Sequence, residues 1–163
     1  MGDPTLIDDA NAGRLSPKVV GLWRLNLLLW TAFIAGAAVA VGWMLDLRTP
    51  GSVVAGAAAV AGMVTAILLP PAQYRSWLFA VGDSDVVIRR GAWWRITSIV
   101  PHSRIQHVDT IHGPLERKLG LSSVVLFTAG TVGASITIPG LPSDQANELR
   151  DRLAALGRTG ESV

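Results

Sequence analysis

The chain begins with two long apolar stretches and continues with short segments of alternating pattern. The stretches Leu25–Leu45 and Gly51–Leu69 contain no charged residue, and only Asp46–Pro50 separates them. A membrane-spanning helix needs about 20 apolar residues to cross a hydrocarbon core roughly 30 Å thick, whereas the apolar runs of buried soluble helices are usually shorter. The pattern therefore predicts a two-helix transmembrane hairpin over residues 19–71, preceded by a flexible cytoplasmic tail over residues 1–18.

The distribution of basic residues predicts how this hairpin is oriented. Cytoplasmic loops of membrane proteins carry more lysine and arginine than external loops. The turn has a single basic residue, Arg48, which stands close to Asp46. The basic residues that flank the other side of the hairpin are Arg14, Lys18, Arg24, Arg75, Arg89 and Arg90. We therefore expect both termini, and the domain that follows the hairpin, in the cytoplasm.

Small residues recur along the second apolar stretch at the spacing of one helical turn. The main members of this pattern are Ser52, Gly56, Ala59 and Gly62. Small residues let two helix backbones approach closely within lipid. Two interpretations stay open: these residues pack the hairpin against itself, or they dock a partner membrane protein or a second copy in a homo-oligomer. No ionisable side chain lies within either stretch, which argues against a transporter or a proton relay.

Beyond Pro70 and Pro71 the pattern changes to short β segments separated by turn residues. Because proline lacks the amide donor, the pair is expected to end the second helix. Strands are predicted over residues 75–81, 86–90, 94–100, 104–111, 124–128 and 135–138.

An amphipathic helix closes the series, with Ser143 as its capping residue and Gly157 at its end. The pattern therefore predicts a membrane α-helical hairpin followed by a mainly-β domain over residues 72–157. We expect this domain to be an antiparallel, partly open barrel capped by the C-terminal helix, with a short tail over residues 158–163.

One segment of this domain resembles a known family. The run Ile99-Val100-Pro101-His102-Ser103-Arg104-Ile105-Gln106-His107-Val108 is similar to the I-P-x-x-R-I-Q-x-V signature of bacterial PH-domain membrane proteins, the YdbS-like group. The residues that carry the match are Pro101, Arg104, Ile105 and Gln106. The resemblance covers residues 20–157 and implies a two-helix hairpin before a pleckstrin-homology-like domain, in a bacterial cytoplasmic membrane. It supplies no biochemical activity.

The residues offer no pattern typical of an enzyme or of a metal protein. The chain has no cysteine, no Gly-x-Ser-x-Gly, no Walker glycine loop and no His-Glu-x-x-His. His102, His107 and His112 are five residues apart, and in a strand this odd offset places neighbours on opposite faces about 16 Å apart. Residues 75–163 hold ten basic and eight acidic residues, unlike a nucleic-acid-binding surface. We expect no catalysis, no metal, no cofactor and no nucleic-acid partner.

The most suggestive cluster surrounds a predicted tight turn at Gly91. Its members are Arg89, Arg90, Trp93 and Arg95. Arginines bind lipid phosphates in bidentate fashion, and indole rings favour the membrane interface. Trp94 has the parity of the apolar positions in the following strand, so a core position remains an alternative for it.

The turn at residues 82–85 limits what the resemblance implies about lipid. Lipid-binding PH domains collect basic residues around the turn after the first strand, whereas this turn carries Asp83 and Asp85. We expect a non-catalytic, membrane-anchored interaction or scaffold module that binds a partner membrane protein or assembly on the cytoplasmic face. The alternative is a module that senses anionic lipid through the hairpin of Arg89, Arg90 and Trp93.

Overall fold

The computed structural model describes residues 12–44, 50–129 and 135–160, and it divides into two compact units. One unit is the hairpin, Val20–Ala72. The other combines the described part of Met1–Val19 with Gln73–Val163. The chain therefore starts in the second unit, leaves it for the hairpin, and returns to it. The predicted turn between the two apolar stretches lies outside the described residues.

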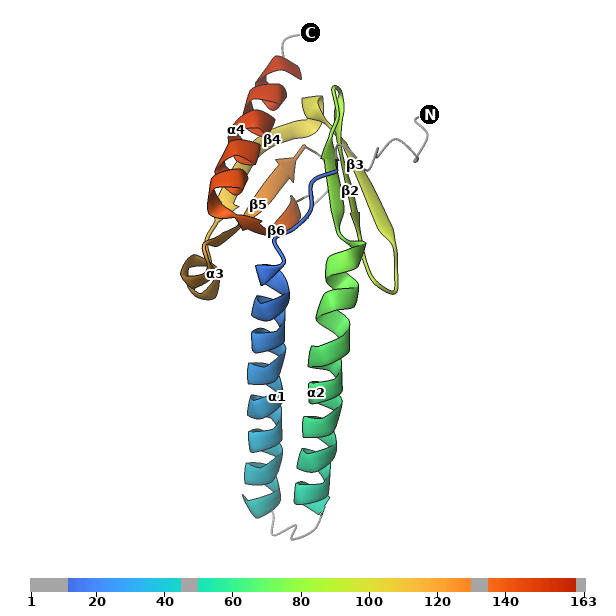
Figure 1. The fold of residues 1–163 in the computed structure, drawn as a ribbon, viewed down its shortest axis with the longest axis vertical. Helices are drawn as coiled ribbons and strands as arrows, with labels where there is room; N and C mark the ends of the chain where they lie inside the picture. The colour runs from blue at the N-terminus through green and yellow to red at the C-terminus, as the bar shows by residue number, and fades with distance from the viewer. Residues whose placement is uncertain (1–11, 45–49, 130–134, 161–163) are drawn as a thin grey trace. The chain divides into compact units, whose positions relative to one another are not determined.

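The hairpin unit is built from α1 (Lys18–Met44) and α2 (Pro50–Ser76), drawn in blue and green in Figure 1. Both helices are long and apolar enough to cross a membrane. Only 6% and 11% of the residues in their most apolar stretches are buried, which is unlike the core helix of a soluble protein. Within the hairpin, Gly62 of α2 lies directly against Thr31 of α1, since a Cβ atom at position 62 would collide with the threonine side chain.

The prediction that Pro70 and Pro71 end the second helix was wrong. Helix α2 continues through both prolines to Ser76. A proline inside a helix removes one backbone hydrogen bond and crowds the preceding turn, but helices in membrane proteins tolerate this where other groups satisfy the freed carbonyls. As a result, residues 75 and 76 are helical, and the first strand starts three residues later than expected.

The described residues of the second unit contain two antiparallel sheets of three strands. The first has the order β1 (Leu78–Val81), β2 (Asp85–Arg90) and β3 (Ile96–Pro101), and the second has the order β4 (Ile105–Ile111), β5 (Leu121–Thr128) and β6 (Ser135–Pro142). The 3₁₀ turn η1 (His102–Arg104) links the sheets, α3 (Pro114–Leu119) links β4 to β5, and α4 (Ser143–Gly160) follows β6. The sheets do not close into a barrel, which confirms the predicted mainly-β, partly open domain.

The core of this domain lies on the inner faces of the sheets and under α4. Its largest fully buried side chains include Ile88, Leu121, Leu126, Ile138, Leu141 and Leu153. Helix α4 contributes Ala146 and Leu153, neither of which is exposed. Gly157 does not end α4, which continues to Gly160. Instead, a Cβ at position 157 would lie 3.1 Å from the backbone oxygen of Ile105, so glycine allows the helix to approach β4 closely.

The segment before α1 is part of this domain. Gly13 exchanges two backbone hydrogen bonds with Phe79 of β1, and the amide of Ser16 donates to the carbonyl of Gly140 in β6 over 2.9 Å. The side chain of Leu15 is buried. This segment therefore joins one sheet to the other just before the chain enters α1. For residues 13–18 this differs from the expected flexible tail, whose residues 1–11 lie outside the described residues.

Candidate membrane-facing surface

The β2–β3 hairpin ends in a loop, residues 91–95, called here the hairpin tip. Arg90 pairs with Ile96 at its base. Gly91 has φ +110°, a conformation that side chains other than glycine rarely adopt. A Cβ atom there would also collide with the carbonyl oxygen of Trp94, so the backbone folds back on itself at this point. Glycine at position 91 is therefore what shapes the tip.

Both tryptophans of the hairpin tip are exposed. Trp93 is 87% and Trp94 is 84% accessible, and the neighbouring Ile96 is 48% accessible. Because β3 begins only at Ile96, the alternation of that strand does not extend back to Trp94, and a core position for Trp94 is excluded. A large indole ring normally buries its apolar body and keeps its N–H near polar groups. Two adjacent exposed indoles therefore mark a surface that fits an amphipathic partner.

Three arginines lie around this tip. Arg95 is in the loop and exposed. Arg89 pairs with Leu78 on one side and Thr97 on the other, which places it on the outer face of the first sheet. Arg90 has the opposite parity, and its guanidinium carbon lies 6.0 Å from the ring centroid of the buried Trp77. The hairpin tip thus combines apolar rings with positive charge, and Trp77 helps to position one of the arginines.

The register of the first sheet locates this tip within the domain. Leu78 is the first residue of β1, and it lies opposite Arg89 near the end of β2. The tip is therefore at the end of the sheet where β1 begins. Strand β1 itself begins two residues after the last residue of α2. The acidic β1–β2 turn, at residues 82–85, lies at the other end of the same strands (Figure 1).

The three histidines have three different environments. His107 is stacked on Phe127 with ring centroids 4.2 Å apart, and its Nε2 lies 3.8 Å from a carboxylate oxygen of Asp109. His112 Nδ1 lies 2.8 Å from the hydroxyl of Ser122. His102 is buried. Among the described residues, no group of three or more histidine or acidic side chains could hold a metal ion.

The residues of the family signature surround the link between the sheets. Ile105 is buried, whereas Pro101, Arg104 and Gln106 are exposed. The backbone carbonyl of Arg104 accepts a hydrogen bond from the amide of Ala129 over 2.9 Å. The register of β4 against β5 shifts between Ile105 and His107, so Gln106 forms a bulge. These positions therefore lie at the turn between the sheets and at the start of β4.

The small residues of α2 differ in what they contact. Gly62 faces Thr31 inside the hairpin. Ser52, Gly56 and Ala59 are exposed, and a Cβ added at position 56 would meet nothing within 4 Å. Packing of the hairpin is therefore seen at Gly62, whereas docking of a partner by the three exposed residues stays a prediction.

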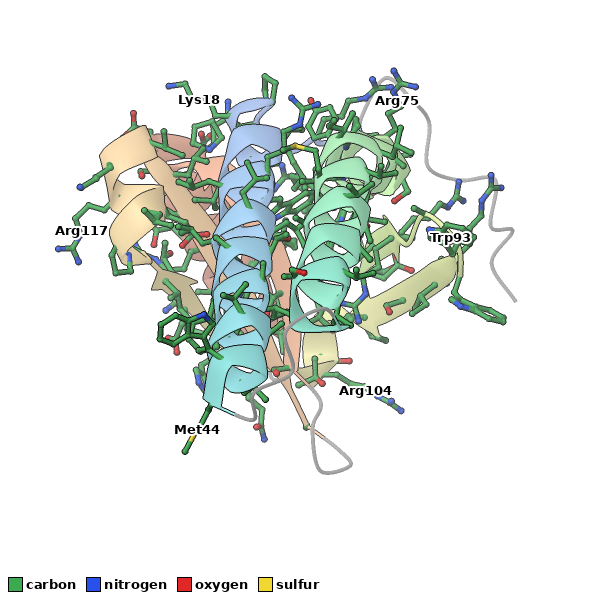
Figure 2. All side chains as sticks on the ribbon, turned by 90° about the horizontal axis from the view of Figure 1, so that it is seen from below. Lys18, Met44, Arg75, Trp93, Arg104 and Arg117 are labelled. Atoms are coloured by element: carbon green, nitrogen blue, oxygen red, sulfur yellow. The ribbon has the colours of Figure 1, made fainter. Side chains whose placement is uncertain are left out.

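Sequence reasoning missed two features of this surface. It left open whether Trp94 is exposed or in the core. Gly91 was the available signal, because a glycine at this position allows a loop long enough to include Trp94. It also did not predict the contact between Arg90 and Trp77, because that contact depends on Trp77 lying between the end of α2 and the start of β1. Figure 2 shows Trp93 pointing away from the domain, with Arg75 near the end of α2.

Comparison with known proteins gives one family and one curated relative. The family model described as "Bacterial PH domain" matches residues 24–157. The chain is 32% identical over 149 residues to the "UPF0699 transmembrane protein YdbS" of Bacillus subtilis (strain 168), which covers 89% of this chain and 92% of that protein. No solved structure matches. With its two apolar helices and its pair of antiparallel sheets, the chain belongs to the bacterial PH domain family, as a YdbS-like transmembrane protein.

Proposed function

We propose that this protein is a non-catalytic interaction module whose PH-like domain binds the surface of an anionic bilayer through the hairpin tip. The observation that carries the proposal is the pair of exposed indoles, Trp93 and Trp94, among three arginines. Indole rings partition to the headgroup region, and each basic residue close to an anionic leaflet contributes about 1 kcal/mol. No motif of a known catalytic site is present in the sequence, so binding rather than catalysis is proposed.

The place of the hairpin tip supports the same proposal. The tip lies at the end of the sheet where β1 starts, and β1 starts two residues after α2 ends. Two residues of extended chain span at most about 7 Å. A tip at this end of the sheet is therefore at the same end of the domain as the last residues of α2. The acidic turn with Asp83 and Asp85 lies at the far end of the sheet, where an anionic surface would not repel it.

We also propose that the domain and both termini are cytoplasmic. The support is the excess of lysine and arginine outside the hairpin turn, which carries Arg48 as its only basic residue. The anionic lipids of the cytoplasmic leaflet are the surface that Arg89, Arg90 and Arg95 would meet. A single cysteine placed at Ser84 in this cysteine-free chain would test the orientation, since a membrane-impermeant reagent should modify it only after the cells are opened.

Tryptophan quenching tests the proposed contact with lipid. The full-length protein and its Trp93→Phe/Trp94→Phe variant would be reconstituted in phosphatidylglycerol-containing nanodiscs with and without brominated acyl chains. The difference in fluorescence between the two proteins reports on Trp93 and Trp94 alone. We expect brominated lipid to quench this difference signal. The control is Ser84→Trp in the double-phenylalanine background, whose added signal should not be quenched. An unquenched signal from the hairpin tip would exclude the proposed contact.

A second candidate function is the binding of a partner membrane protein or of a second copy of the chain. Strand β3 pairs only with β2 within the described sheets, so its other edge has no strand partner there. Ile96 and Ile99 on this strand are 48% and 52% exposed. An exposed sheet edge can accept an added strand. The exposed residues Ser52, Gly56 and Ala59 of α2 offer a separate surface for a partner helix within the membrane.

Copurification distinguishes this candidate from lipid binding. The protein would be extracted from its native membrane in mild detergent, and the copurifying proteins would be quantified by mass spectrometry. A stoichiometric partner that is lost in an Ile99→Glu variant and kept in the Trp93→Phe/Trp94→Phe variant would support the second candidate. Purification of the chain alone, as a monomer, would count against it.

A further inference from the structure

Helix α3 presents a second surface, separate from the hairpin tip, that is basic and partly apolar. It has six residues, Pro114–Leu119, between β4 and β5. Its one acidic residue, Glu116, is turned toward the domain: one carboxylate oxygen accepts from the amide of Gly113 and the other from the hydroxyl of Ser123, both over 2.8 Å. These two hydrogen bonds fix how the short helix is rotated. They also direct the carboxylate of Glu116 toward Gly113 and Ser123.

The outward side of α3 is therefore made of apolar and basic side chains. Leu115 and Leu119 are each 37% exposed, and their spacing of four residues places them on the same side of the helix. Lys118 is exposed next to them, and Arg117 is exposed on the other side of Lys118 around the helix. Figure 2 shows Arg117 and Trp93 pointing outward on opposite sides of the domain. Leucine beside lysine and arginine on one surface is the composition of segments that lie in a membrane interface.

The hydrogen bonds around α3 place it at a particular end of the domain. The residue after α3, Gly120, accepts a hydrogen bond from the amide of Ser143 over 3.1 Å, next to the end of β6. The same end of β6 holds Gly140, whose carbonyl accepts from Ser16. Helix α1 begins at Lys18, two residues after Ser16. Helix α3 is therefore at the end of the second sheet where the chain leaves for the membrane.

The segment before α1 also relates this end to the hairpin tip. Gly13 is bonded to Phe79 in the first sheet, and Ser16, only three residues on, is bonded to Gly140 in the second. The start of β1 and the end of β6 thus lie on the same side of the domain. The hairpin tip adjoins the start of β1, and α3 adjoins the end of β6. Both therefore project from this side (Figure 1).

We infer that α3 is a second contact with the bilayer, in which Leu115 and Leu119 enter the headgroup region and Arg117 and Lys118 bind phospholipid phosphates. The inference rests on the proposed function in one respect, namely that this end of the domain meets the bilayer. It depends on the side chains of α3 and not on those of the hairpin tip. Two separate contacts, one from each sheet, hold the domain in one orientation on the membrane. A single contact at the tip would leave the second sheet without a lipid contact of its own.

Spin labels at single cysteines test this inference in the full-length chain, because the natural sequence has no cysteine. Labels would be placed by Leu119→Cys and, since that change removes a half-buried side chain, separately by Lys118→Cys. The comparison labels are Trp93→Cys at the hairpin tip and Ser84→Cys at the opposite end of the sheet. In nanodiscs that contain phosphatidylglycerol, each label is assessed by its accessibility to oxygen relative to a water-soluble nickel chelate.

We expect the α3 labels to show a higher ratio of oxygen to nickel accessibility than the Ser84→Cys label. An additional Arg117→Glu change on the Lys118→Cys protein should lower the docked-to-free ratio of α3 by at least roughly fivefold, because one further basic contact of about 1 kcal/mol is lost. Equal ratios at α3 and at Ser84→Cys would overturn the inference. If the Trp93→Cys label is then still in lipid, only the α3 contact fails; if α3 is in lipid and Trp93→Cys is in water, only the proposed role of the tip fails.

Discussion

The hydroxyl of Tyr74 donates a hydrogen bond to the backbone carbonyl of Leu15 over 3.2 Å. Leu15 comes three residues before α1 begins, and Tyr74 is in the last turn of α2. The two segments through which the chain leaves and re-enters the PH-like domain are therefore joined to each other. This contact defines one end of the domain as the end from which the hairpin starts, and both proposed lipid contacts project from that end.

Removing this hydroxyl should loosen the segment before α1. For Tyr74→Phe we expect the free energy of unfolding to fall by about 1 kcal/mol, because one hydrogen bond is lost while the aromatic ring remains. Hydrogen exchange should increase at the amides of Gly13 and Ser16, which bond to Phe79 and Gly140. The matched control is Ser76→Ala, which removes a hydroxyl that bonds only within α2 to Gln73. Unchanged exchange at Gly13 and Ser16 in Tyr74→Phe would show that the contact does not hold the segment.

The shape of the hairpin tip should depend on Gly91. Its φ of +110° and the nearby carbonyl of Trp94 leave no room for a side chain. We expect Gly91→Ala to cost about 1–3 kcal/mol, since it forces a residue with a Cβ into a sparsely populated conformation. Thermal unfolding of the purified protein measures the loss. Ala92→Ser, which changes the adjacent exposed residue, should leave the midpoint unchanged; equal midpoints for both variants would contradict this account of the turn.

The two glycines of α2 should respond differently to a large side chain. A leucine at Gly62 would collide with Thr31 and push the two helices of the hairpin apart, whereas Gly56 has nothing within 4 Å of an added Cβ. Overpacking typically costs 1–3 kcal/mol. We expect Gly62→Leu to lower the resistance of the hairpin to unfolding in a denaturing detergent and Gly56→Leu to leave it unchanged. If Gly56→Leu alone changed the oligomeric state, the outward face of α2 would be an interface between copies.

The core between the sheets should carry most of the stability of the domain. Leu126 is completely buried in β5, and Leu→Ala changes in cores usually cost 2–5 kcal/mol. We expect a loss in this range for Leu126→Ala in denaturant unfolding. Ile111→Ala, at a position that is 52% exposed, should cost much less. Similar losses for the two variants would mean that the sheets do not pack on Leu126 as described.

Much of the architecture follows directly from the sequence. Two uncharged runs of about 20 residues admit few alternatives to a membrane hairpin, and the spacing of Ala146 and Leu153 indicates an amphipathic C-terminal helix. The alternation of Ile136 and Ile138 with polar neighbours locates part of β6. These features depend on local periodicity, and the structure confirms them.

The features that could not be predicted depend on tertiary contacts. Helix α2 passes through Pro70 and Pro71, although each proline removes a backbone donor. Gly157 lies inside α4 because the helix packs closely on Ile105, so a residue typical of a helix end serves a packing role instead. Gly13 and Ser16 join the two sheets through backbone hydrogen bonds, which leave no signature in the side chains.

The central claim, that the hairpin tip faces the bilayer, is tested most directly by the rate at which a cysteine there is modified. Trp93→Cys and Ser84→Cys place single thiols in exposed loops at opposite ends of β2. In phosphatidylglycerol nanodiscs, a membrane-impermeant maleimide should modify the Trp93→Cys protein at least about tenfold more slowly, which corresponds to 1.4 kcal/mol of docking free energy. In detergent the two rates should converge. Equal rates in nanodiscs would contradict the claim.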